Sequence, residues 1–105
     1  MTTKTFHIGD ILSVTSGIFC TPNGMGGLYD ILNWMTGDDL MTHQLPRASR
    51  ECAPDLRRQH PDLAGVSVPG FSGEAEGLAW IAWQVQIFGE TREVAPLTAG
   101  DRMGR

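Results

Sequence analysis

The sequence has no excess of positive charge. Lysine and arginine together number 8 against 12 aspartate and glutamate residues, which gives a formal net charge of -4. A protein that binds DNA without regard to sequence needs a surplus of cations to neutralise the phosphates. The charge balance therefore argues against bulk DNA binding, although it leaves room for a local basic patch.

Cysteine is also scarce, since Cys20 and Cys52 are the two in the chain. They stand far apart, outside any CxxC pattern and without histidines at ligand spacing, so the sequence predicts no zinc site. The favoured interpretation is a pair of buried thiols in a cytosolic protein, and a disulfide is the alternative. No apolar run approaches the roughly 20 residues that cross a bilayer, and the N-terminus lacks a secretory hydrophobic segment. We therefore expect a cytoplasmic protein that does not enter a membrane.

Signatures of catalysis are missing as well. The chain contains no GxSxG motif, no Walker motif and no dinucleotide-binding fingerprint. The three histidines are widely scattered, and the pair Asp38–Asp39 stands where a helix cap is expected, so the sequence disfavours metal catalysis. We expect a non-enzymatic protein that requires neither a cofactor nor a metal.

The composition is otherwise that of an ordinary globular protein, with 41% hydrophobic and 19% charged residues. We expect one α+β domain over residues 1–97, followed by a flexible tail over residues 98–105. Residues 5–20 are rich in β-branched and aromatic types, which predicts two short strands or one strand with a turn at Ser16–Gly17. Together with a closing strand over residues 91–97, they would form a small antiparallel sheet.

Two main helices and some short helical turns are expected to pack against this sheet. Residues 27–36 place apolar side chains at helical spacing before a glycine stop at Gly37. Residues 74–88 form the second main helix. The prolines between them predict that residues 39–60 are short helices joined by proline corners, where Pro46 either ends one helix or begins a new turn.

The helix expected over residues 74–88 is apolar on more than one face. One stripe consists of Leu78, Ile81, Val85 and Phe88. The other stripe consists of Trp80, Trp83 and Ile87. A helix that is apolar over so much of its circumference is either central in the core or shared with another chain. We predict a homodimer or higher oligomer with the second stripe near the subunit contact.

A polar and basic cluster occupies the middle of the chain. We expect a ligand to be held by His43, Gln44, Arg47, Arg50, Arg57, Arg58 and His60, with Trp34 beside them. Guanidinium groups offer planar forks of donors for phosphate, and an aromatic ring can stack on a base, so the cluster predicts a site for a small anionic nucleotide. In the structural alternative, Arg47 and Glu51 form an i,i+4 surface ion pair. His43 then caps a helix end, and Arg57 and Arg58 lie on a solvated helix face.

Several stretches of the chain match one known group of proteins. They are "HIGDILSVTSG" near the start, "YDILNWMTGD", "THQLPRA" and "QHP" in the middle, and "GET" with "VAPL" near the end. On these stretches the chain resembles a family of small uncharacterised proteins of tailed phages and prophages, over most of residues 6–97. The resemblance implies phage origin and action in the host cytoplasm, and it implies no catalytic residue or cofactor.

Analogy with other small accessory phage proteins leads us to expect a counter-defence role. The favoured hypothesis is a non-catalytic sponge that sequesters an anionic nucleotide signal, as anti-Thoeris and anti-CBASS proteins do. The alternative is an anti-CRISPR-type inhibitor that grips a bacterial defence protein and presents carboxylates in place of phosphates. The carboxylates available for that role are Asp38, Asp39, Glu74, Glu76, Glu90 and Glu93.

Overall fold

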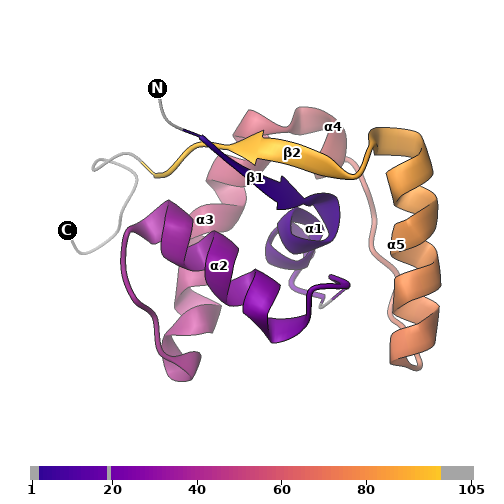
Figure 1. Ribbon diagram of the computed structural model, residues 1–105, viewed down its shortest axis with the longest axis horizontal. Helices are drawn as coiled ribbons and strands as arrows, with labels where there is room; N and C mark the ends of the chain where they lie inside the picture. Colours follow the sequence, from indigo (N-terminus) through magenta and orange to yellow (C-terminus); the bar gives the residue numbers. More distant parts are fainter. Residues whose placement is uncertain (1–2, 19, 98–105) are drawn as a thin grey trace.

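The computed structural model describes residues 3–18 and 20–97, so the tail predicted over residues 98–105 lies outside the described residues. The elements in chain order are β1 (Lys4–His7), α1 (Ile8–Ser16), α2 (Gly24–Thr36), the 3-10 turn η1 (Thr42–Gln44), α3 (Leu45–Gln59), α4 (Pro61–Ala64), α5 (Glu74–Phe88) and β2 (Thr91–Val94). The two strands lie across one side of the helices, α1 is central, and α5 stands at one end of the molecule (Figure 1). The predicted α+β class is confirmed.

The sheet joins the two ends of the described chain. β1 pairs with β2 in antiparallel register, with Lys4 opposite Val94 and His7 opposite Thr91. Phe6 and Val94 turn their side chains inward and are buried. The prediction of a small antiparallel sheet made from the N-terminal segment and the closing strand is therefore confirmed.

The prediction of strands throughout residues 5–20 was wrong after His7, because Ile8–Ser16 form helix α1. The side chain of His7 caps this helix by accepting the N–H of Gly9 at 2.9 Å, and Gly17 ends it with a φ of 75°. The apolar residues Ile8, Ile11 and Leu12 recur at helical spacing and are fully buried. Burial of this stripe outweighs the strand preference of the β-branched residues in the segment.

Helix α2 confirms the helix predicted over residues 27–36 but begins three residues earlier. The start of α2 lies against a buried carboxylate of α1, that of Asp10, which is only 2% exposed. Asp10 accepts hydrogen bonds from the hydroxyl of Thr21 and, at 3.3 Å, from the amide of Asn23. The close approach leaves no room for a side chain at Gly27. Asp10 thereby fixes the loop that enters α2.

Helix α3 corrects the prediction of short helices joined by proline corners, because Leu45–Gln59 form one continuous helix. Pro46 lies in its first turn, where a missing N–H costs little, so the alternative in which Pro46 begins a turn is confirmed. Pro54 lies inside the helix and supplies no N–H to the carbonyl of Arg50. A stripe of buried residues holds the helix together across this gap, namely Leu45, Ala48, Cys52 and Leu56.

The core lies between α1, α2 and α3. Its fully buried side chains include Ile11, Leu12, Ile31, Leu32, Met35 and Leu56. Cys20 and Cys52 are both buried and form no disulfide, so the prediction of a buried pair of thiols is confirmed. Helix α5 has the predicted bounds but buries only Gly77 and Ile81, and it therefore lies at the margin of this core.

Candidate functional site

A hollow of about 660 Å³ lies between three helices. Its walls are the last turn of α1, the start of α2 with Met25 and Leu28, and one face of α3. The residues that α3 contributes are Leu45, Pro46, Ser49, Arg50, Ala53, Pro54 and Arg57. We call this feature the α1–α3 hollow. Its volume falls within the range of about 300 to 1,000 Å³ that is typical of small-molecule sites.

Two of the predicted ligand residues, Arg50 and Arg57, line the α1–α3 hollow. They are two helical turns apart, so both project from the same face of α3, with Cα atoms about 10 Å apart along the axis. Within residues 3–18 and 20–97, no hydrogen bond or ion pair engages the guanidinium of Arg50, and this exposed side chain lines the hollow. Arg50 is therefore the residue most available to an anion.

Arg57 already has one partner. Its Nη2 donates to the backbone carbonyl of Thr15 in the last turn of α1. The last carbonyls of a helix have no donor within the helix and carry a partial negative charge, so a guanidinium is a favourable neighbour for them. Arg57 thus joins α3 to the end of α1 and lines the same hollow.

The rest of the lining is largely apolar. Val14, Met25, Leu28, Pro46 and Ala53 provide hydrocarbon surface around the two arginines. The thioether of a methionine is flexible and polarisable, and it adapts to flat ring systems. No aromatic side chain lines the hollow among the described residues. A flat group bound here would lie against methionine, leucine and proline.

Arg47 does not line the α1–α3 hollow, although it belongs to the same helix. Its Nε lies 3.3 Å from Oε1 of Glu51, and its side chain is 62% exposed. The i,i+4 ion pair of the structural alternative is therefore confirmed for Arg47. The Glu51 side chain is only 6% exposed, so the pair joins a solvated guanidinium to a carboxylate at the edge of the core.

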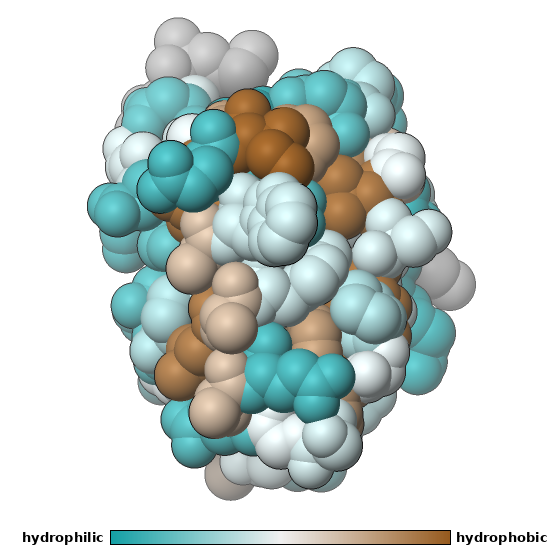
Figure 2. Space-filling model, turned by 90° about the vertical axis from the view of Figure 1, so that its right-hand side faces the viewer, coloured by the Kyte–Doolittle hydropathy of each residue, from teal (hydrophilic) through white to brown (hydrophobic). Residues whose placement is uncertain are grey.

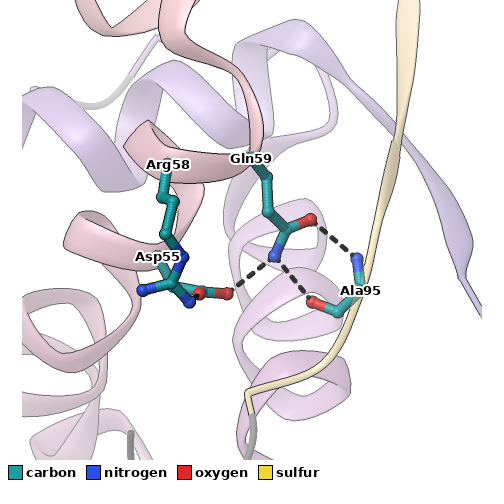
Figure 3. Close-up of polar contacts among 4 residues, drawn as sticks. All are labelled: Asp55, Arg58, Gln59 and Ala95. Atoms are coloured by element: carbon teal, nitrogen blue, oxygen red, sulfur yellow. Dashed lines mark hydrogen bonds and ion pairs between the residues drawn. The ribbon is translucent and has the colours of Figure 1, made fainter.

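A second group of contacts holds the end of the chain's closing segment against α3, and Figure 3 shows four of its residues, Asp55, Arg58, Gln59 and Ala95. Arg58 pairs with the buried carboxylate of Asp55. The amide of Gln59 donates to Asp55 at 2.6 Å and to the carbonyl of Ala95 at 3.1 Å, and its oxygen accepts the N–H of Ala95 at 2.9 Å. The Nε2 atom of His60 lies 2.8 Å from the carbonyl of residue 93. These residues fasten the segment after β2 to α3 and are not gathered at the hollow.

The predicted ring and the remaining polar residues also lie elsewhere. Trp34 donates its indole N–H to the carbonyl of Val94 at 2.8 Å, which ties α2 to β2. His43 and Gln44 are exposed in η1, where Gln44 accepts the N–H of Met41 at 2.8 Å. Neither these residues nor Trp34 line the α1–α3 hollow. The eight predicted residues therefore do not form one site, because Trp34 and His60 bind backbone carbonyls of β2. Arg47 and Arg58 pair with carboxylates of their own helix.

Sequence reasoning missed the wall that α1 provides. The signal was present, since Ile8, Ile11 and Leu12 recur at helical spacing and Gly17 is a typical helix stop. Reading the segment as strands concealed that its last carbonyls would face α3. Without that wall, there was no reason to place Met25 and Leu28 of α2 beside the arginines of α3.

Helix α5 presents a separate apolar face (Figure 2). Trp83 is 70% exposed and Ile87 is 58% exposed, and apolar side chains run along the helix on this side of the molecule. Trp80, the third residue of the predicted stripe, is half-buried and packs on Phe71 with ring centroids 5.8 Å apart.

The described part of the chain offers no metal centre, since residues 3–18 and 20–97 contain no group of three or more His, Cys, Asp or Glu side chains placed to hold an ion. Of the helices observed in these ranges, none has both the length and the apolar character that a membrane crossing requires.

Comparison with known proteins gives one match. Residues 6–66 match the model of a family described as a domain of unknown function (DUF7736), which is more than half of the chain. The matched segment contains every wall of the α1–α3 hollow, whereas α5 and β2 lie beyond it. No curated protein and no solved structure gives a match.

Proposed function

The chain belongs to the DUF7736 family, a domain of unknown function, and we propose that it binds a small anionic ligand of nucleotide type in the α1–α3 hollow without converting it. The observation that carries the proposal is the guanidinium of Arg50, which lines the hollow and has no partner among the described residues. The Arg50 side chain is exposed to solvent, so an anion could form charge-assisted hydrogen bonds with it without displacing a partner from the described chain.

The hollow also suits the remainder of a nucleotide. A guanidinium can grip a phosphate through two parallel hydrogen bonds, and the two arginines on one face of α3 can divide the charge of a phosphodiester or diphosphate between them. The apolar lining around Met25 and Leu28 would cover a base or a ribose face. A few well-placed polar groups within a mostly apolar cleft are the usual composition of such sites.

The biological role that we propose is sequestration of a bacterial immune nucleotide by a phage-encoded protein in the host cytoplasm. The resemblance of the "YDILNWMTGD" and "THQLPRA" stretches to tailed-phage proteins supports this role. So does the composition of the hollow, which offers binding groups and no nucleophile paired with a base among its lining residues. A sponge of this kind requires affinity alone.

The proposal is tested by calorimetry with AMP, ADP-ribose and cyclic di-AMP, using the parent protein and two variants of one helix. Arg50→Ala removes the free guanidinium, whereas Arg47→Ala removes an arginine that points away from the hollow and serves as the matched control. Loss of charge-assisted hydrogen bonds predicts about 10- to 100-fold weaker binding for Arg50→Ala, and unchanged binding for Arg47→Ala. Equal loss in both variants, or no binding by the parent, would contradict the proposal. Recovery of a chemically altered nucleotide after heating would show an enzyme instead.

We further propose that two copies of the chain associate through α5. Ala75, Ala79 and Ala82 lie on the exposed side of this helix between Leu78 and Trp83, and small residues there allow a second helix to approach closely. An antiparallel two-fold pairing would place this small-residue surface of α5 in each copy against that of the other.

Light scattering tests this association. The parent should have the mass of two chains and Trp83→Asp the mass of one, because the aspartate places a charge at the centre of the contact. Ala64→Asp adds the same charge at an exposed position of α4 and should leave the mass unchanged. A parent protein with the mass of one chain would remove the proposal.

A monomeric parent would favour the second candidate function, an inhibitor that grips a bacterial defence protein through the free face of α5. The carboxylates predicted for such a role are not gathered in one place, because Glu74 and Glu76 lie at the first turn of α5 and Glu90 lies beyond its last turn, about 22 Å away. The two functions separate in a phage plaque assay on cells that carry a defence system. If the protein sequesters a nucleotide, protection of the phage should be lost in Arg50→Ala and kept in Trp83→Asp. If it inhibits a defence protein directly, protection should be lost in Trp83→Asp and kept in Arg50→Ala.

A further inference from the structure

The α1–α3 hollow has an acceptor side opposite its arginines. The last carbonyls of α1 face it, and residues 13–17 line this side of the hollow. The Ser13 carbonyl accepts the N–H of Gly17 at 3.1 Å, and the Thr15 carbonyl accepts Arg57. No residue in the described ranges donates to the carbonyls of Val14 and Ser16, which come after the last position that the helix itself can satisfy.

Helix α3 adds a further acceptor from its own backbone. Pro54 lines the hollow and has no N–H, so the carbonyl of Arg50 lacks the donor that a regular helix would provide. This carbonyl and the two open carbonyls of α1 belong to different elements that border the same space. The hollow therefore combines a cationic group with backbone carbonyls that can accept hydrogen bonds from a ligand or from water.

An anion alone would not match this arrangement. Negative oxygens close to the end of α1 meet carbonyls and the negative end of the helix dipole, which is unfavourable. A ligand satisfies both sides if one end is anionic and the other end carries N–H donors on an apolar body. Among nucleotides, this description fits those whose base bears an exocyclic amino group.

We infer that the α1–α3 hollow selects nucleotides with an exocyclic amino group on the base, which donates to the backbone carbonyls at the end of α1 while the phosphate binds Arg50. The inference rests on the proposed function, since it adds an orientation and a selectivity to the same site. The ring of the base then lies against the apolar side chains of Met25 and Leu28.

The test compares each nucleotide of the calorimetric panel that binds with its purine riboside counterpart, in which hydrogen replaces the amino group. Loss of one or two hydrogen bonds predicts about three- to tenfold weaker binding of the counterpart. The same ratio should persist in Arg47→Ala, which leaves the hollow intact. In Arg50→Ala, both ligands should weaken together because the amino group and the phosphate have separate partners.

The outcomes distinguish the inference from the function on which it rests. Equal affinity for a nucleotide and its purine riboside counterpart would overturn the amino-group selectivity and leave the anion site in place. Failure of every nucleotide in the panel to bind would overturn the proposed function and the selectivity with it. Weaker binding of the amino-bearing nucleotide would reverse the inferred orientation.

Discussion

Two adjacent glycines in the first turns of α2 offer a sharp test of how the loop before this helix is fixed. Gly26 is exposed, and a Cβ atom built on it meets nothing within 4 Å. A Cβ atom on Gly27 would lie 2.7 Å from the Cβ of Asn23 and would also collide with the carboxylate of Asp10. Alanine at the first position should therefore stabilise the protein, and alanine at the second should destabilise it.

The magnitudes follow from the contacts. Replacing an exposed helical glycine by alanine gains about 0.5–1 kcal/mol. At Gly27 the same gain is offset by overpacking, which costs about 1–3 kcal/mol. Displacing the Asp10 carboxylate also weakens its hydrogen bonds to Thr21 and Asn23, and bonds to a charged group contribute about 1.5–3 kcal/mol each. We expect Gly27→Ala to be about 2 kcal/mol less stable than the parent and about 3 kcal/mol less stable than Gly26→Ala.

Thermal unfolding followed by circular dichroism measures this difference. At about 4–8 °C for each kcal/mol in a domain of this size, the two alanine variants should unfold roughly 12–24 °C apart. Gly27→Ala should cost less stability in an Asp10→Ala background than in the parent, because the first change removes the carboxylate that the new methyl group would strike, although the close contact with Asn23 remains. Two single alanine variants that unfold within about 1 kcal/mol of each other would refute the reasoning.

Two further predictions concern ionisable groups. The hydrogen bond from Arg92, at 2.8 Å, lowers the pKa of the Asp62 carboxyl, so the pair should stabilise the fold above the unfolded pKa of about 3.9 and lose this effect as the pH falls through the lower folded value. In urea titrations, Asp62→Asn should therefore be less stable than the parent at neutral pH and equal to it in strong acid, and a constant difference at every pH would count against the ion pair. Burial raises the pKa of the Cys20 thiol, and the thiolate is the reactive form, so both cysteines should react with a disulfide reagent far more slowly in the native protein than in urea. Fast native reaction would show that the core opens around Cys20.

Regular hydrophobic spacing made part of the fold predictable. The stripe of Ile31, Leu32 and Met35 before Gly37 predicted α2, and the length and glycine stop of the segment 74–88 predicted α5. Two segments were predicted wrongly because their residue types conflicted with their hydrophobic spacing. The β-branched residues of α1 suggested strands, and the prolines of α3 suggested breaks, yet packing of each buried stripe on the other helices decided both segments.

The site was predictable only in part, for a physical reason. Arginines at positions 50 and 57 share a helix face, which sequence spacing can indicate. The roles of Arg58 and His60 depend on β2 and the segment after it, which returns to α3 from more than 30 residues further along the chain. Local sequence around these residues does not contain that information. The same holds for Trp34, whose partner is the carbonyl of Val94.

The pairing of Lys4 with Val94 also sets an order of events during synthesis. β1 leaves the ribosome first and must wait for its partner until almost all of the described chain has emerged. Closing a chain segment of this length costs about 4 kcal/mol of entropy, which a pair of four-residue strands does not recover by itself. Collapse of the helices encoded between the strands has to bring the two ends together beforehand. Co-translational folding of this protein should accordingly begin with α1, α2 and α3, and closure of the sheet should be its final step.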